Sequence, residues 1–104
     1  MRFFVYHIAL KQDWVDAKQK HIYEKSTKDK TLADTGFIHL SFKEQIPAIL
    51  NSVYKNEKRE LVLLKIPIRH LKDKIKFEKS DGEIYPHYYG PINPKWVTKE
   101  SPVA

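Results

Sequence analysis

Leu61-Val62-Leu63-Leu64-Lys65-Ile66-Pro67-Ile68 is a nearly continuous apolar run in a chain that is otherwise rich in lysine. Short runs of Val, Ile and Leu are typical of strands in the middle of a sheet. Proline cannot donate a hydrogen bond to a neighbouring strand, so Pro67 predicts the end of this strand. We therefore expect a central strand here, with the other elements arranged around it.

A second strand is predicted from Arg2 to Leu10. Alternation places Val5, His7 and Ala9 on one face and Tyr6 and Ile8 on the other. Because both faces are largely apolar, this strand is expected to be covered on both sides. His7 would then point into a mostly buried layer.

Two helices are predicted. The first runs from a cap at Asp13 to Lys20. The second follows Ser41 and Glu44, which form a Ser-x-x-Glu capping box. Pro47 lies one turn too deep for that cap, so the alternative is a helix that starts near Glu44 with Pro47 in its first turn.

The remaining segments carry weaker signals. The pattern predicts a mobile polar loop at 25–34, strands at 37–40, 75–78 and 95–99, a turn at 81–82, and an ordered aromatic loop at 84–94. Strands combined with two helices indicate an α+β domain. A chain of 104 residues predicts one domain over 1–104.

The amino-acid composition excludes several kinds of functional site. The chain has no cysteine, which excludes disulfides, thiolate metal sites and cysteine nucleophiles. The net charge is +6, but only three of the 19 basic residues are arginine. This favours a solvated lysine surface over a nucleic-acid site. No targeting or membrane segment is apparent, so a soluble cytoplasmic protein is expected. No oligomeric state is predicted.

Three histidines stand in motifs that are expected to be ordered. These motifs are Tyr6-His7-Ile8, Gly36-Phe37-Ile38-His39-Leu40-Ser41 and Pro86-His87-Tyr88-Tyr89-Gly90-Pro91. Histidine changes charge near neutral pH, so the three together suggest a site. Histidines bonded to the backbone in a core are the alternative. No two of them have metal-ligand spacing, and no metal is expected.

Other side chains offer chemistry of their own. Glu78 can project from a short strand into a cleft as a base or a cation stabiliser, or pair with a surface lysine. Ser41 lacks a nucleophile elbow, and capping explains it. The Pro86–Pro91 segment has the composition of a rigid binding loop. Five tyrosines could stack on a base or fill the core: Tyr23, Tyr54, Tyr85, Tyr88 and Tyr89.

In this order, the motifs resemble the family called domain of unknown function 952 over nearly the whole chain. Besides the histidine motifs, the resemblance rests on Trp14, Tyr23, Gln45, the strand Leu61–Leu64 and Glu78. The chain departs from the family pattern in two places. Lys20 and His21 stand where a glycine precedes the tyrosine, and Thr31-Leu32 replaces Ser-Leu after a longer loop.

The resemblance implies a fold like that of ADP-ribosyltransferases and RNA 2′-phosphotransferases, with a small split or mixed sheet and two main helices around an NAD-binding cleft. It implies Glu78, His39 and His87 as catalytic residues. The ligand-binding residues that it implies are His7, Tyr23, Thr31, Ser41 and Tyr89. Two functions stay open: an ADP-ribosyltransferase-like enzyme with NAD or a related nucleotide, or a non-catalytic module that binds a small molecule or RNA.

Overall fold

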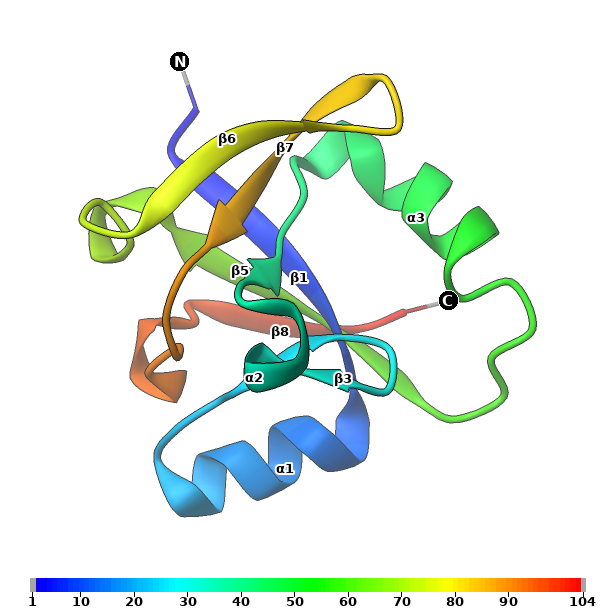
Figure 1. The fold of residues 1–104 in the computed structure, drawn as a ribbon. Coiled ribbons are helices and arrows are strands. Elements are labelled where there is room, and N and C mark those ends of the chain that lie inside the picture. Colours follow the sequence, from blue (N-terminus) through cyan, green and yellow to red (C-terminus); the bar gives the residue numbers. More distant parts are fainter. Residues whose placement is uncertain (1, 104) are drawn as a thin grey trace.

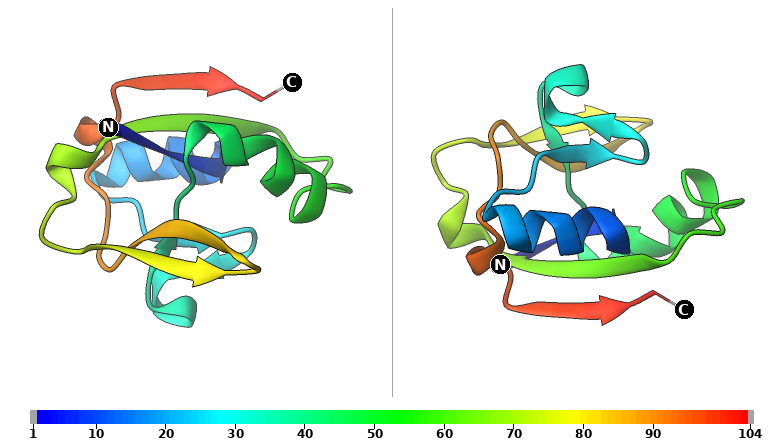
Figure 2. Two further views of the ribbon diagram at one scale, coloured as in Figure 1. Left: turned by 90° about the horizontal axis from the view of Figure 1, so that it is seen from above. Right: turned by 90° about the horizontal axis from the view of Figure 1, so that it is seen from below.

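Two separate three-stranded antiparallel sheets form the body of the protein in a computed structural model that describes residues 2–103 (Figures 1 and 2). The first has the order β1 (Phe4–Leu10), β5 (Leu61–Pro67), β8 (Lys99–Pro102). The second has the order β4 (Ile38–His39), β7 (Glu83–Tyr88), β6 (Ile75–Ser80). The prediction of an α+β fold is confirmed. Met1 and Ala104, the ends of the expected domain, lie outside the described residues.

The prediction that residues 61–68 form a central strand is confirmed, because β5 pairs with β1 on one side and β8 on the other. Its alternate residues Val62, Leu64 and Ile66 are buried. The register sets Leu64 opposite His7, on the same face of the sheet. Helix α1 (Lys11–Lys20) contributes Trp14 to this core.

The helices begin at positions other than those expected. Helix α1 starts at Lys11, so the predicted cap at Asp13 is wrong, and Asp13 instead lies in the first turn, where its charge suits the helix dipole. Helix α3 (Ile46–Ser52) follows a 3-10 turn and holds Pro47 in its own first turn. This confirms the later start. The capping box at Ser41 is wrong.

The polar segment 25–34, predicted to be a mobile loop, is an ordered hairpin and helix. Strands β2 (Lys25–Thr27) and β3 (Lys30–Thr31) pair, and helix α2 (Leu32–Thr35) follows. Thr31 Oγ1 accepts from the Asp34 amide at 3.1 Å, and the Thr31 amide donates to Asp34 at 2.9 Å. This capping box is difficult to recognise in the sequence, because Thr31 and Asp34 lie in a polar segment. Gly36, with φ +95°, ends the helix.

The segment 84–94 was predicted to be a loop, yet its first half is strand β7, which pairs with β6 and β4. The expected turn at Asp81 and Gly82 is confirmed, with φ values of 52° and 83° that suit a tight hairpin. The strand predicted at 95–99 is displaced toward the C-terminus, because β8 begins only at Lys99. The start of the predicted range belongs to a 3-10 turn, Pro94–Trp96. Within residues 2–103 no helix is long and apolar enough to cross a membrane.

One backbone bridge joins the two sheets. Tyr6 and Ser41 exchange two hydrogen bonds of 2.8 Å, while the Leu40 amide donates to the Pro86 carbonyl oxygen at 3.1 Å. The chain from β4 to Ser41 therefore contacts β7 on one side and β1 on the other. The sheet is split at this seam, and the seam is where the three histidine motifs meet.

Candidate functional site

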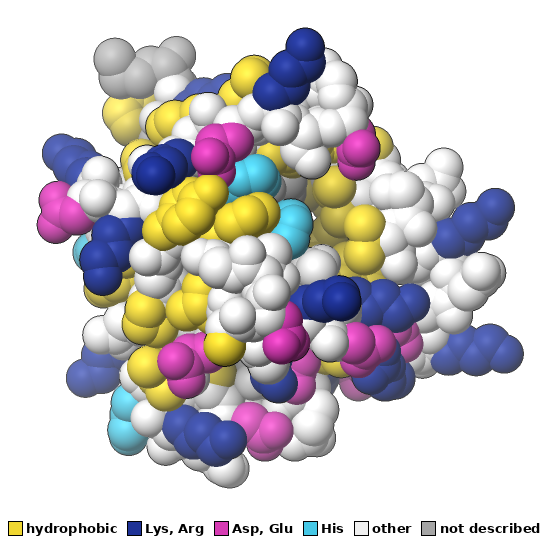
Figure 3. All heavy atoms as spheres, in the orientation of Figure 1, with side chains coloured by type: hydrophobic (Ala, Val, Ile, Leu, Met, Phe, Trp, Pro, Cys, Tyr) yellow, Lys and Arg dark blue, Asp and Glu magenta, His cyan; other side chains and the backbone are white. Residues whose placement is uncertain are grey.

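A cleft of about 410 Å³ lies at the seam between the two sheets. Its lining comes from β1, the segment after β4, helix α3 with the loop that follows it, and the two hairpins. These residues are Tyr6, His7, Ile8, Thr27, His39, Leu40, Ser41, Ala48, Ile49, Ser52, Val53, Tyr54, Ser80, Asp81, Tyr85 and His87. Figure 3 views the molecule from the side on which histidine side chains border a hollow in the middle of the surface.

His39 and His87 form a cross-strand pair on β4 and β7. Their ring centroids are 5.5 Å apart and the rings meet edge to face. Phe37 packs on both rings, at 4.0 Å from His87 and 4.8 Å from His39. Two imidazoles at this spacing can reach neighbouring atoms of one bound ligand.

Ser26 of β2 fixes the orientation of His39. The buried Ser26 hydroxyl donates to the Phe37 carbonyl oxygen and lies 2.9 Å from His39 Nδ1. Since the hydroxyl hydrogen is used on Phe37, its oxygen accepts from Nδ1–H, and the Nε2 lone pair of His39 is left to act as a base. Desolvation of the ring, followed by the nearby His87, lowers the pKa of His39 from 6.5. His39 is therefore neutral at pH 7.

Glu78 of β6 fixes the orientation of His87. Its Oε1 lies 2.8 Å from His87 Nδ1 and accepts from the Tyr89 hydroxyl at 2.6 Å. The Tyr89 hydroxyl first, and then His87, lower the pKa of Glu78, which is a carboxylate at neutral pH. The carboxylate holds the proton on Nδ1 and leaves Nε2 as the nitrogen for a ligand. Among residues 2–103 no hydrogen bond reaches Nε2 of either His39 or His87.

His7 has a different role, because the protein uses both of its ring nitrogens. Nδ1 donates to the His39 carbonyl oxygen at 2.6 Å, and the Tyr23 hydroxyl donates to Nε2 at 2.7 Å. Burial lowers the pKa of His7 to about 4, so the ring is neutral. His7 ties β1 to β4 and to Tyr23 at the base of the cleft.

The structure brings most of the predicted site residues together, at different depths. His7, His39, His87 and Ser41 line the cleft. Glu78, Tyr23 and Tyr89 do not line the cleft but bind the histidines or their partners. Thr31 is elsewhere. It caps α2 and borders a second hollow of about 550 Å³ beside α1.

Sequence reasoning missed Ser26 and Tyr6 as site residues, whereas it named Tyr85 among the tyrosines that could stack on a base. Ser26 lies in the segment that was taken for a mobile loop, so nothing linked it to His39. Tyr6 and Tyr85 line the cleft from two different sheets. Tyr6 stands in the first histidine motif and Tyr85 precedes the third, and the period of two along a strand was the available signal that Tyr85 shares a face with His87.

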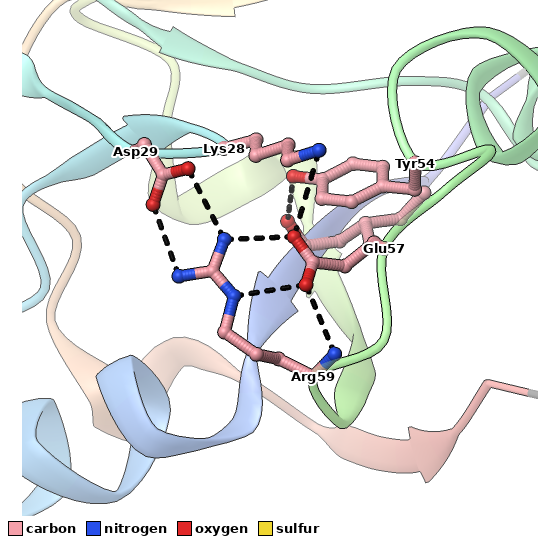
Figure 4. Close-up of polar contacts among 6 residues, drawn as sticks. Lys28, Asp29, Tyr54, Glu57 and Arg59 are labelled. Carbon is pink, nitrogen blue, oxygen red and sulfur yellow. Dashed lines mark hydrogen bonds and ion pairs between the residues drawn. The ribbon is translucent and has the colours of Figure 1, made fainter.

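A charged cluster lies next to Tyr54, a residue of the cleft lining (Figure 4). The guanidinium of Arg59 lies between two carboxylates, at 3.1 Å from Asp29 and 2.7 Å from Glu57. Lys28 Nζ is 3.6 Å from Glu57. The cluster joins the β2–β3 turn to the loop after α3, beside the lining residue Tyr54, whose hydroxyl donates to the Ile8 carbonyl oxygen at 3.3 Å. We call these four charged residues the latch.

The lining fits some parts of NAD and not others. Tyrosine rings and hydroxyls suit a nicotinamide and its ribose. A diphosphate needs cations, a helix N-terminus or a nest of amides. Of the lining residues, all within 2–103, none is lysine or arginine, and Asp81 is a carboxylate. The cleft therefore does not fit the diphosphate. Residues 2–103 also hold no group of three potential metal ligands.

A family model and solved structures match this chain. The family model "Protein of unknown function (DUF952)" matches residues 8–100. The crystal structure of CC0527 from Caulobacter crescentus is 34% identical, with a TM-score of 0.83 over 97% of this chain and 86% of that one. Its solution NMR structure is 35% identical, with a TM-score of 0.75 over 94% and 82%. No curated protein matches. The chain therefore belongs to the DUF952 family.

Proposed function

We propose that the cleft binds a nucleotide-like small molecule and that His39 and His87 transfer protons in a group-transfer or hydrolysis reaction on it. One observation carries the proposal: the two histidines face each other across β4 and β7, each with Nδ1 held by the protein. The tautomer of each ring is thereby set before any ligand arrives. Oriented rings of this kind are what acid–base catalysis requires.

The two rings differ in a way that suits opposite roles. His39, neutral and bonded to an uncharged serine, is the base and takes the proton from the attacking hydroxyl or water. His87 in its protonated form is the acid and gives its Nε2 proton to the leaving group. The Glu78 carboxylate at Nδ1 stabilises the imidazolium. Such a pair contributes about 10²–10⁴-fold to each proton transfer.

The ADP-ribosyltransferase-like assignment belongs to this proposal. It is supported by two small sheets that meet at one cleft. In this geometry Glu78 would be a positioning residue, since it contacts His87 and Tyr89 and does not line the cleft. NAD consumption stays a prediction, and no step of the mechanism depends on it.

The test is an assay for binding and turnover of NAD, nicotinamide riboside and adenosine. We expect the unmodified protein to bind at least one of them, and His39→Gln or His87→Gln to abolish any turnover while binding persists. His21→Asn is the control, because His21 is exposed and its left-handed backbone (φ 64°) tolerates asparagine. Absence of binding at millimolar ligand would refute the proposal.

The alternative is a module that binds without catalysis. The tyrosines of the lining and the complete hydrogen bonding of His7 favour it, since they build a shaped cleft without a reacting group. Saturable binding with no turnover of any probe would select it. An RNA partner would show binding that weakens steeply with salt.

A further inference from the structure

We infer that the cleft selects an uncharged, ring-containing ligand of nucleoside size and disfavours ligands that bring a phosphate into it. This inference rests on the proposed function and narrows its substrate class. It comes from three properties of the lining: its charge, its pattern of rings and hydroxyls, and its size.

The charge of the lining opposes an anion. Asp81 is its one carboxylate, and none of its members is a lysine or an arginine. The cations of the latch, beside the lining residue Tyr54, are engaged in ion pairs (Figure 4). Arg59 binds Asp29 and Glu57, and Lys28 lies beside Glu57. A phosphate in the cleft would lose hydration and find no lysine or arginine among the lining residues, and the charge of protonated His87 is already paired with the Glu78 carboxylate.

Rings and hydroxyls are distributed as a nucleoside would need them. Tyr6 and Tyr85 supply aromatic faces, and Ile8, Leu40 and Ile49 add apolar surface. A planar base can pack on such a surface without sequence-specific contacts.

A sugar has its own partners at the hairpin end of the cleft. Ser80 and Asp81 stand at the β6–β7 turn, whereas the Ser52 hydroxyl on α3 already donates to the Ala48 carbonyl oxygen at 2.9 Å. A carboxylate with two oxygens can accept from both hydroxyls of a vicinal diol, and serine can donate or accept. His39 and His87 lie further along the same lining.

The volume of the cleft also favours a ligand of nucleoside size. The cleft volume of about 410 Å³ is near the lower end of the range of about 300–1,000 Å³ that ligand sites span. A base with one sugar matches such a volume better than a dinucleotide does.

The decisive experiment compares adenosine, AMP and NAD on the unmodified protein by isothermal titration calorimetry. We expect adenosine to bind at least as tightly as either phosphate-bearing ligand. Tyr85→Leu should weaken adenosine binding about tenfold, in line with the loss of one stacked ring. Phe77→Leu is the matched control, because Phe77 is an exposed aromatic residue of the same hairpin that does not line the cleft.

A gain-of-function variant tests the charge argument. Ser52 is exposed and lines the cleft, so Ser52→Lys adds a cation there. It should tighten AMP binding about two- to fivefold, as an exposed ion pair would, and leave adenosine binding unchanged.

The outcomes separate this inference from the proposed function. AMP or NAD binding more than tenfold tighter than adenosine would overturn the inference and leave the proposed function standing. Adenosine binding that Tyr85→Leu does not weaken would also overturn it. If neither these three ligands nor nicotinamide riboside binds at millimolar concentration, both are refuted.

Discussion

His39 and His87 stand directly opposite each other in the β4–β7 ladder, with ring centroids 5.5 Å apart. His39 and His87 are 48 positions apart in the sequence, and the pairing of β4 with β7 brings them together. Each ring is anchored through Nδ1 by a different kind of group, a hydroxyl for His39 and a carboxylate for His87. This difference makes the pair chemically asymmetric, and it can be measured.

The surroundings of His39 should make its ring harder to protonate than a free histidine. Desolvation and the neighbouring His87 lower its pKa from 6.5, so an NMR titration should place its midpoint below 6.5. The base is active when deprotonated, so any turnover should rise with pH through that same midpoint. In His87→Gln the midpoint should move up, because a neighbour that lowers the pKa is gone. A midpoint above 6.5 in the unmodified protein would contradict this account.

Glu78→Gln should change the hydrogen bonding of His87 while the cleft still binds its ligand. Glutamine cannot stabilise an imidazolium as a carboxylate does, so we expect turnover to fall by about ten- to a hundredfold with little change in ligand affinity. The ¹⁵N shifts of His87 should show a lower Nδ1–H population. Glu24→Gln, at an exposed position away from the cleft, is the control. An unchanged His87 spectrum would rule out the positioning role.

The bonds of His7 predict a destabilised Tyr23→Phe variant. The missing hydroxyl leaves the buried Nε2 of His7 without a donor, which should cost about 1–3 kcal/mol in urea unfolding at pH 7. The rings otherwise keep the same shape, so the fold should persist. A loss below about 0.5 kcal/mol would mean that the His7–Tyr23 bond contributes little.

The lowered pKa of His7 also predicts that the protein loses stability as the pH falls. Its pKa falls from 6.5 in the unfolded chain to about 4 in the folded protein, so the unfolded state binds more protons between these values. Stability is complete above pH 6.5 and declines as pH falls toward 4, by roughly 3 kcal/mol from this group. Urea unfolding across this window measures the slope. His7→Gln should flatten it, whereas His21→Asn should leave it unchanged.

Breaking the ion pairs of the latch should loosen the β2–β3 hairpin locally and leave the rest of the fold intact. Glu57 has only 6% of its side chain exposed, and Arg59 lowers its pKa to about 2. Arg59→Gln should therefore speed amide hydrogen exchange in residues 25–31, which the latch holds against the loop after α3. Lys58→Gln, next to Arg59 and outside the latch, is the control. Equal exchange in both variants would show that the hairpin is held by its other contacts.

The sequence predicted the apolar framework better than the polar connections. Leu61–Pro67 was recognisable because a buried strand needs an apolar run, and Pro67 marks its end. The hairpin of β2 and β3 was not, because its strands are short and polar and it contacts distant residues such as Arg59. Local propensity does not register such tertiary contacts.

The histidine site was predicted in its members and not in its geometry. His7, His39 and His87 do share one cleft, but sequence could not show that His7 uses both nitrogens internally while the other two keep Nε2 available. Glu78 was expected in the cleft but lies outside its lining, hydrogen-bonded to His87. Those distinctions depend on side-chain depth, which is set by packing between segments far apart in the chain.

The bridge between Tyr6 and Ser41 limits how this chain can change in length. Ser41 is held at β1 and His39 at β7, so the number of residues between the two anchors is set by geometry. Successive side chains in a strand point to opposite faces, and one inserted or deleted residue there would turn His39 away from its partner. A length change of one residue in this segment would therefore disrupt the site together with the core residue Leu40 that stands between the two anchors.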